Sequence, residues 1–321
     1  MNNIKSPDMS VILVTPDTYE NIRKVVNHLR EQTVKDRLEI IIVSPSVEML
    51  NVDDSQLKDF NHIQLIEVGA FSSTGEAITA GIRKASAPVV AFCEEHSYPD
   101  AGWAAALIEA HQKPWAAVGC VLCNANPDSL ISWSNIYMDF GPCVDPAKGG
   151  EATFLAPHHI SYKREILSRY GPDLPYMYEI ESVLCNDLLE KGYRLYLEPR
   201  SKRNHVNITR LSSYIRAQFI GGRIFGAIRA RHFRWSIFRR ALYIVGSPLI
   251  PLLRLWRTTK EISRTGRKDE LMPQILPALI IGLVSSALGE VWGYALGPGL
   301  AQERRITFEV NRSEHLAKQN I

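Results

Sequence analysis

Two carboxylates and an imidazole follow a short apolar run in the first third of the chain. The run is Pro88–Phe92, and after Cys93 come Glu94, Glu95 and His96. Short apolar runs bounded by turn formers are typical of buried strands in an α/β sheet, and the ligands of such sheets bind outside the carboxyl ends of the strands. Carboxylate oxygen and imidazole nitrogen together can hold a divalent cation, which neutralises the charge that develops when a diphosphate leaves. The segment therefore predicts a metal and phosphate site, and the alternative is a solvated acidic turn.

A second group of ionisable residues lies between positions 178 and 205. Apolar residues recur at helical spacing over Tyr178–Lys191, with Glu179 and Glu181 in the first turn. Acids in a first turn stabilise the helix dipole, which explains both glutamates without any further chemistry. After a predicted strand at Tyr193–Leu197, His205 is expected in a basic loop. A lone histidine is more often structural than a ligand.

The periodicity of the apolar residues indicates which elements position these groups. It predicts strands at Met9–Val14, Leu38–Val43 and Ile63–Val68, and helices at Tyr19–Gln32 and Gly75–Ala85. Strands that alternate with helices indicate a mostly parallel sheet with right-handed crossovers. The predicted fold class is therefore α/β, of the type that binds nucleotides.

The common phosphate-binding loops do not occur in the sequence. Neither Gly-x-Gly-x-x-Gly nor Gly-x4-Gly-Lys-Ser/Thr is present, and Thr15-Pro16-Asp17-Thr18 follows the first strand instead. Any nucleotide must therefore be held by other means, such as a metal that bridges its phosphates. The segment 122–153 is rich in Asn, Asp, Pro and Gly and is expected to be an irregular stretch that lines or covers the site.

Charge is distributed unevenly along the chain, although the formal net charge is only +3. Residues 200–268 carry 17 Lys and Arg and a single acid, Glu261, for a net charge of +16, while the remainder carries 20 basic and 33 acidic residues, for a net charge of −13. Such a split indicates that the basic segment meets an anionic surface, either nucleic acid or a membrane leaflet. Interleaved apolar residues favour lipid. No nucleic acid is expected as a partner, because the segment lacks a recognised nucleic-acid motif.

Two apolar stretches lie within and after the basic segment. Ala241–Leu253 is about half the length that spans a bilayer, and Ile275–Leu296 approaches that length but is interrupted by proline, glycine and a glutamate. Positive charge flanks both stretches, which argues for helices that lie in the membrane interface without crossing it. Trp235, Trp256 and Trp292 are placed as interface anchors. The alternative is two core helices or a homodimer interface.

Composition and cysteine content indicate the number of domains and the cellular compartment. The 321 residues, 45% of them hydrophobic, suit one large domain over residues 1–230 and an appendage over residues 231–321. The five cysteines suit a reducing compartment, and the pair Cys120 and Cys123 is expected to be buried in a strand, with zinc or redox use as the alternative. Because the N-terminus lacks a secretory pattern, the first domain is expected in the cytoplasm.

These stretches occur in an order that resembles the family 2 glycosyltransferases of the GT-A fold, over roughly residues 9–230. The matching stretches are Met9–Asp17, Glu94-Glu95-His96 with Pro99 and Trp103, Gly149-Gly150, Glu179-Ile180-Glu181 with Gly192-Tyr193-Arg194-Leu195, and His205. The tail sequence Gly289–Tyr294 is similar to that of bacterial members of the family. The resemblance implies a bacterial nucleotide-diphospho-sugar transferase with a C-terminal membrane-associating tail.

The chain departs from the family pattern at three places. The family's Asp-x-Asp becomes Glu94-x-His96, and imidazole favours Mn²⁺ and later transition ions over Mg²⁺. Ser44-Pro45-Ser46 stands where relatives often carry an Asp for the base, and Ala77-Ile78-Thr79 stands where many carry Ala-Arg-Asn. The identity of the nucleotide base therefore stays open.

The resemblance implies a role for each site residue. The reaction is inverting transfer, in which an acceptor hydroxyl attacks the anomeric carbon while a nucleoside diphosphate leaves. Glu181 matches the Asp of the family's Glu-Asp pair and is implied as general base, with Glu179 as the competing assignment. The implied metal ligands, for Mn²⁺ or Mg²⁺, are Glu94, His96 and His205. The implied nucleotide contacts are Thr15, Asp17, Ser44, Glu94 and Glu95.

The implied partners are a nucleotide-sugar donor, a glycan or lipid-linked acceptor and an anionic membrane surface. The protein is then expected at the cytoplasmic face of the membrane, peripheral or monotopic, in the synthesis of a cell-envelope polysaccharide or glycolipid. The alternative is a catalytically silent GT-A-like module that binds a nucleotide sugar or scaffolds polysaccharide assembly, which the altered Asp-x-Asp favours. The two differ in geometry, because an enzyme needs Glu94, His96 and His205 around one ion-sized gap, with Glu181 facing it.

Overall fold

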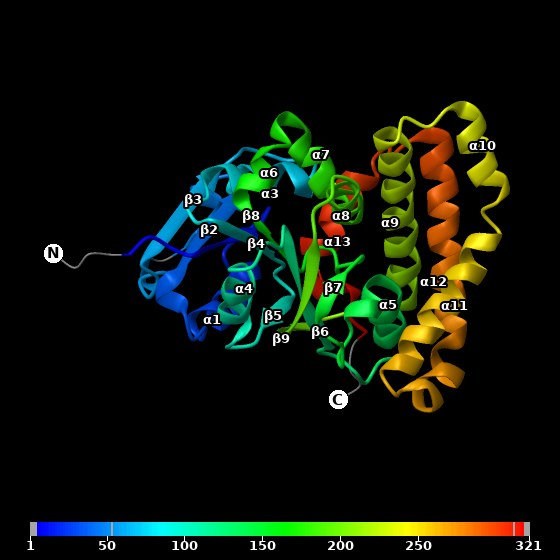
Figure 1. The fold of residues 1–321 in the computed structure, drawn as a ribbon, viewed down its shortest axis with the longest axis horizontal. Helices are drawn as coiled ribbons and strands as arrows, with labels where there is room; N and C mark the ends of the chain where they lie inside the picture. The colour runs from blue at the N-terminus through cyan, green and yellow to red at the C-terminus, as the bar shows by residue number, and fades with distance from the viewer. Residues whose placement is uncertain (1–4, 53, 311, 318–321) are drawn as a thin grey trace. The chain divides into compact units, whose positions relative to one another are not determined.

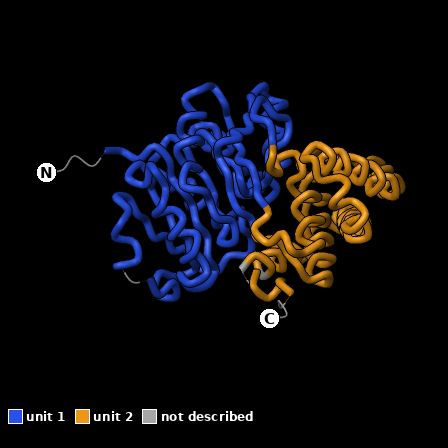
Figure 2. Tube along the Cα trace, turned by 90° about the horizontal axis from the view of Figure 1, so that it is seen from below, with its two compact units in different colours: residues 1–123, 147–205 blue, residues 124–146, 206–321 orange. Residues whose placement is uncertain are grey.

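The computed structural model of the chain describes residues 5–52, 54–310 and 312–317 (Figure 1). By packing, the chain divides into two compact units, one of residues 1–123 and 147–205 and one of residues 124–146 and 206–321 (Figure 2). The first unit holds the sheet and the second is helical. The division into one large domain over residues 1–230 and an appendage over residues 231–321 stays a prediction.

One sheet organises the first unit. Its strand order is β3-β2-β1-β4-β8-β6-β9-β5, and β7 pairs with β9 at the side of this path. The strands are β1 (Met9–Val14), β2 (Leu38–Ser44), β3 (His62–Glu67), β4 (Val89–Cys93), β5 (Ser97–Pro99), β6 (Ala117–Asn124), β7 (Gly150–Ala152), β8 (Ile160–Lys163) and β9 (Leu195–His205). The predicted α/β fold with a mostly parallel central sheet is confirmed.

The parallel half of the sheet brings three strand ends to one edge. β1 pairs in parallel with β2 and β4, and Val14 lies opposite Val43 while Leu13 lies opposite Cys93. The residues that follow these strands therefore meet at one edge, as expected for the ligand-binding edge of an α/β sheet. The second half begins with β8, which runs antiparallel to β4 and β6.

Helices cover the sheet of the first unit, and α1 shows how sequence periodicity places them. Its residues Ile22, Val25, Val26 and Leu29 are all buried, so the predicted apolar face is confirmed. The helices of this unit are α1 (Glu20–Arg30), α2 (Val47–Leu50), α3 (Thr74–Lys84), α4 (Trp103–Ala110), α6 (Arg164–Ser168), α7 (Leu174–Glu179) and α8 (Glu181–Glu190).

The single helix predicted over Tyr178–Lys191 is wrong. The chain breaks at Ile180, whose backbone angles are φ −131° and ψ 86°, so Glu179 ends α7 and Glu181 begins α8. Local periodicity missed the break because its cause is not local. The Glu179 carboxylate accepts hydrogen bonds from α3 and its N-cap, whereas the Glu181 carboxylate accepts them from β8 and the loop before it.

Two further elements differ from the sequence expectation. His205 is the last residue of β9, opposite Ser97, and does not lie in a loop. The segment 122–153 is not irregular throughout, because it contains α5 (Leu130–Phe140). The hydroxyl of Ser129 caps this helix by accepting a hydrogen bond from the Ser132 amide, a common start signal inside a polar run.

Helices make up the second unit. They are α5, α9 (Leu211–His232), α10 (Ile237–Val245), α11 (Leu249–Arg264), α12 (Lys268–Leu296) and α13 (Ala301–Val310). α9 and α12 lie side by side (Figure 1). A Cβ at Gly222 or Gly226 of α9 would collide with the backbone of α12, and one at Gly289 or Gly293 of α12 with that of α9. Paired small-xxx-small spacings thus let the two backbones approach closely.

Among the described residues, one helix is long and apolar enough to cross a membrane, judged by length and composition alone. This helix is α12, and 44% of its most apolar window is buried inside the structure. Glu290 within it is paired with Arg254 of α11 and accepts a hydrogen bond from Tyr294 at 3.1 Å. Trp235, expected as an interface anchor, is buried against Ala230 and Tyr294, so that prediction is wrong for this residue. Trp256 and Trp292 are exposed, by 62% and 47%.

Candidate active site

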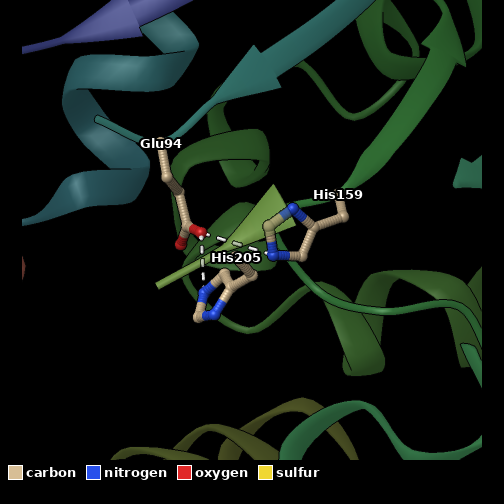
Figure 3. A group of neighbouring side chains, drawn as sticks. All are labelled: Glu94, His159 and His205. Carbon is tan, nitrogen blue, oxygen red and sulfur yellow. Dashed lines mark ion pairs between the residues drawn. The ribbon is translucent and has the colours of Figure 1, made fainter. Parts of the chain in front are cut away.

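One carboxylate, that of Glu94, gathers imidazoles from separate elements of the sheet. Glu94 follows β4, His159 directly precedes β8 and His205 ends β9, and all three side chains point toward one another (Figure 3). The Glu94 Oε2 atom lies 3.3 Å from Nε2 of His159 and 3.6 Å from Nε2 of His205. It also lies 3.6 Å from Nε2 of His96. All four side chains are buried.

The structure therefore places Glu94 and His205 together, keeps His96 beside Glu94, and adds a candidate ligand, His159, that the sequence did not predict. Glu94, His159 and His205 each offer one ligand atom, and these atoms lie within 4.8 Å of one another. The available signal was the pair His158-His159, which stands just before a strand, as Glu94 stands just after one. Sequence alone does not show that the two strands, β4 and β8, are neighbours.

The protonation of this group suits metal binding. Burial by itself would raise the pKa of Glu94, but the neighbouring imidazoles of His96, His159 and His205 hold it well below its ordinary value. Burial lowers the pKa of His159 well below its ordinary value, although the Glu94 carboxylate acts in the opposite direction. An ionised carboxylate beside a neutral imidazole is the pair of forms that binds a metal ion.

The contacts also test whether these residues fit a divalent ion. Within the described part of the chain, Glu94 Oε2 is buried and accepts no hydrogen bond. The imidazole nitrogens at 3.6 Å lie beyond hydrogen-bond length but within reach of a shared ion. A buried anionic oxygen is costly unless it is compensated, and a cation would compensate it. The residues therefore fit the predicted metal.

His96 is oriented by its neighbour Glu95. Oε1 of Glu95 lies 2.9 Å from Nδ1 of His96, which leaves the Nε2 atom on the side of Glu94. A carboxylate that holds the far nitrogen of an imidazole is the usual support for a metal-ligating histidine. Glu95, predicted to contact the nucleotide, thus contacts His96 in this structure.

Arg203 joins the segments that carry the ligands. Its guanidinium is fully buried and donates hydrogen bonds to the carbonyl oxygens of Phe92, Ser97 and His158, at 3.0 to 3.3 Å. Phe92 lies in β4, Ser97 begins β5, and His158 precedes the candidate ligand His159. A planar guanidinium group has several hydrogen-bond donors and can therefore join several backbone carbonyl groups. Arg203 is therefore a positioning residue, and sequence reasoning did not single it out.

Glu181 occupies a buried polar pocket next to the same loop. Its side chain is fully buried and accepts hydrogen bonds from the backbone amide of His158 and, at 2.8 Å, from the hydroxyl of Tyr162. Nδ1 of His158 lies 3.7 Å from its carboxylate. Burial raises the pKa of Glu181, against the lowering effects of His158 and of these hydrogen bonds. The consecutive residues His158 and His159 thus contact Glu181 and Glu94 respectively.

Glu179 has a different environment. Its carboxylate accepts hydrogen bonds from the Ser73 hydroxyl at 2.7 Å and from the Gly75 amide at 3.0 Å, at the N-terminus of α3. A carboxylate there is stabilised by the helix dipole. A Cβ at Gly75 would collide with the carbonyl oxygen of Pro175, so α3 and α7 pack closely at this point. These contacts give Glu179 a role in packing α7 on α3.

The predicted nucleotide contacts lie at the same edge of the sheet as Glu94. Thr15 follows β1 and donates its amide hydrogen to the carbonyl of Val43, while its hydroxyl accepts from the amide of Asp17. Thr15 is buried and Asp17 is exposed. Ser44 ends β2, and its hydroxyl donates to the carbonyl of Ser46. Their role in nucleotide binding stays a prediction.

Comparison with known proteins gives matches to one family model and to solved structures. Residues 10–171 match the model of glycosyl transferase family 2. No curated protein matches the chain. The mannosyltransferase PcManGT from Pyrobaculum calidifontis, in complex with GDP-Man and Mn²⁺, is 17% identical with a TM-score of 0.53, over 90% of this chain and 88% of that chain. TarS 1–349 of S. aureus, in complex with UDP, is 16% identical with a TM-score of 0.46, over 90% and 92%.

Proposed function

This chain belongs to glycosyl transferase family 2, whose model matches just over half of its 321 residues, and on that premise we propose an inverting, metal-dependent sugar transfer. The predicted GT-A fold is confirmed. The proposed donor is a nucleotide-diphospho-sugar, and the proposed acceptor is a hydroxyl of a glycan or of a lipid-linked glycan. The observation that carries the proposal is the buried group of Glu94 and imidazoles at the carboxyl edge of β4.

The donor and metal classes have support outside the chain itself. The mannosyltransferase with the same fold is described in complex with GDP-Man and Mn²⁺, that is, with a sugar nucleotide and a divalent transition ion. At 17% identity that likeness concerns the fold, so the base and the sugar are left to experiment. The edge residues Thr15, Asp17 and Ser44 are the proposed contacts of the nucleotide, with Glu95 supporting His96.

The proposed chemistry divides between the two buried carboxylates. A divalent ion held by Glu94, His205 and a further imidazole would take up the charge of the leaving diphosphate. Glu181 is the proposed general base, because its raised pKa brings it nearer to the range in which a carboxylate accepts a proton effectively. To receive that proton, Glu181 exchanges one of its present donors for the acceptor hydroxyl. Glu179 is the weaker assignment, since its hydrogen bonds from Ser73 and Gly75 serve the packing of α7 on α3.

The test is release of nucleoside diphosphate from a panel of UDP-, GDP- and dTDP-sugars by the full chain, with Mn²⁺ or Mg²⁺. We expect metal-dependent turnover of one donor, which names the base and the sugar. If no donor is turned over and one still binds, the proposal of an enzyme is wrong. If none binds, the assignment of the site is wrong.

A catalytically silent module is the second candidate, and one observation favours it. The Glu181 side chain is fully buried and already accepts hydrogen bonds from the His158 amide and the Tyr162 hydroxyl, so in this state it is not exposed to an acceptor. Such a module would bind the nucleotide sugar and scaffold the assembly of a polysaccharide. The same donor panel separates the candidates, because a silent module binds a donor without releasing its diphosphate.

For location, we propose attachment to the cytoplasmic face of the membrane through α10 and α11. The side chains of Phe238, Leu242 and Val245 recur at helical spacing on α10 and are exposed by 87%, 69% and 79%. On α11, Leu252 and Trp256 are exposed by 64% and 62%. Exposed cations lie among these residues, at Arg239, Arg257 and Lys260. An apolar face mixed with cations is complementary to an anionic lipid surface.

Replacing Phe238 and Leu242 together by Ser is expected to weaken binding to vesicles that contain phosphatidylglycerol by at least about tenfold, because each large side chain contributes roughly 2 kcal/mol on burial. Flotation of the full chain with vesicles measures this, and high salt is expected to weaken the wild type as well. The control is Met49→Ser in α2, which is also exposed, by 44%. Equal flotation of the double variant and the wild type would contradict membrane docking through α10. Self-association that the double variant abolishes, with no vesicle binding by the wild type, would indicate a homodimer interface instead.

A further inference from the structure

We propose that His159 is a metal ligand and that Glu94, His159 and His205 form a resident transition-metal site, which holds its ion in the absence of nucleotide. The inference rests on the proposed function only for what the ion does during transfer. The binding itself concerns the protein alone. The ligand set differs from the one that the sequence predicts, because His159 takes the place next to His205 that His96 was expected to fill.

The spacing of the ligand atoms carries the first step. Zinc-like ions bind nitrogen and oxygen at about 2.0 to 2.1 Å in tetrahedral sites, which places two ligand atoms roughly 3.3 Å apart. Oε2 of Glu94 lies 3.3 Å from Nε2 of His159 and 3.6 Å from Nε2 of His205. Because the distances between these ligand atoms are already close to those in a tetrahedral site, the side chains need little movement to receive an ion.

The second step is that the two histidine ligands are held by the fold and not by the nucleotide. His205 is fixed in β9 opposite Ser97 of β5. His159 donates its amide to the carbonyl of Ala156, and its own carbonyl accepts from the amide of Cys120. Arg203 adds a hydrogen bond to the carbonyl of the preceding residue, His158. A pre-organised ligand set lowers the entropic cost of binding, so affinity without nucleotide is expected.

The third step is the chemistry of the donors. Two imidazoles and one carboxylate favour first-row transition ions, with affinity rising from Mn²⁺ toward Co²⁺ and Zn²⁺, whereas Mg²⁺ prefers oxygen ligands and keeps its waters. His96 faces the same carboxylate oxygen at 3.6 Å and is oriented by Glu95. A third imidazole within reach increases this preference. The site is therefore expected to select a transition ion against Mg²⁺.

The experiment uses the full chain, stripped of metal and equilibrated without nucleotide against Zn²⁺, Co²⁺, Mn²⁺ or Mg²⁺. We expect about one Zn²⁺ or Co²⁺ per chain by elemental analysis, weaker binding of Mn²⁺ and no retained Mg²⁺. In His159→Asn the affinity for Co²⁺ is expected to fall at least about 100-fold, the upper end of what loss of a supporting residue alone costs. His62→Asn is the control, because that imidazole lies on the edge strand β3 of the same unit, and the Co²⁺ affinity of this variant is expected to equal that of the wild type.

A second variant keeps the test decisive if His159→Asn folds poorly. His159→Cys offers a thiolate, which also binds Co²⁺ and Zn²⁺. A new thiolate-to-cobalt absorption band in this variant is expected only if residue 159 touches the ion. The inference is overturned if the band is absent, if His159→Asn binds Co²⁺ as the wild type does, or if the wild type binds these ions only together with a nucleotide.

The outcome is separable from that of the proposed function. Binding of Co²⁺ through residue 159 without turnover of any donor would contradict the proposed sugar transfer and support the proposed metal site. The opposite result is also possible: a donor is turned over as fast with Mg²⁺ as with any transition ion, and His159→Cys shows no cobalt band. That result would support the proposed sugar transfer and overturn the inference.

Discussion

Glu94→Gln is expected to lower metal-dependent release of nucleoside diphosphate by roughly 10²- to 10³-fold or more, the range seen when a group that stabilises developing charge is removed. The amide keeps the shape of the side chain and removes its charge. Glu94 Oε2 is the atom that His96, His159 and His205 all approach within 3.6 Å, so its loss removes the common ligand of the group. The measurement is the turnover rate with the donor that the panel identifies, beside the affinity for Mn²⁺ or Co²⁺ without nucleotide.

The control for this variant is Glu48→Gln, an exposed glutamate on α2 in the same unit. Its rate and metal affinity are expected to equal those of the wild type. Both variants are compared with the wild type by their unfolding midpoints in the absence of metal, which separates loss of the site from loss of the fold. A Glu94→Gln protein that keeps metal-dependent turnover would refute the assignment of Glu94 as the central ligand.

Glu181→Gln is expected to lower the rate of transfer by about 10²- to 10⁴-fold, the usual contribution of general acid–base catalysis, while metal binding stays as in the wild type. Gln keeps one of the two carboxylate oxygens, so it still accepts a hydrogen bond from His158 or from Tyr162, but it cannot take a proton. The pH profile separates a base from a structural residue. A base must be ionised, and burial raises the pKa of Glu181, so the wild-type rate is expected to rise with pH through a pKa above the ordinary glutamate value of 4.5. That rise should vanish in the variant.

The matched control is Glu179→Gln, two residues earlier and also buried. Its contacts with Ser73 and Gly75 join α7 to α3, so a lower unfolding midpoint is expected, with the rise of the rate with pH retained. A pH profile that is unchanged in Glu181→Gln, or abolished in Glu179→Gln alone, would exchange the two assignments. The pH dependence of the free energy of unfolding tests the raised pKa of Glu181 independently. Because the pKa of Glu181 is raised on folding, its protonated form favours the folded state, and that contribution is present at low pH and lost as pH rises through the raised pKa.

The elements of the first unit follow from local sequence because their signals lie within short windows. The face of α1 and the apolar runs of β1 and β2 repeat at 3.6 and 2 residues, or as continuous buried runs, and the structure has them where the periodicity predicts. The same windows fail where a distant partner decides the backbone. Ile180 breaks a helix that its own neighbours favour, because the flanking glutamates bond to different parts of the unit.

The sequence by itself predicted the fold class, which is confirmed, and proposed the edge of the sheet for the candidate site, with Glu94, His96 and His205 as its metal ligands. Only the tertiary structure decided that His159 joins Glu94 and His205, that buried Arg203 holds their segments together, and that Trp235 lies inside a core. The physical reason is how far apart in the chain the interacting residues lie. Periodic burial is written within one element, whereas the meeting of β4, β8 and β9 depends on strand order and register, which arise from pairings between residues far apart in the chain.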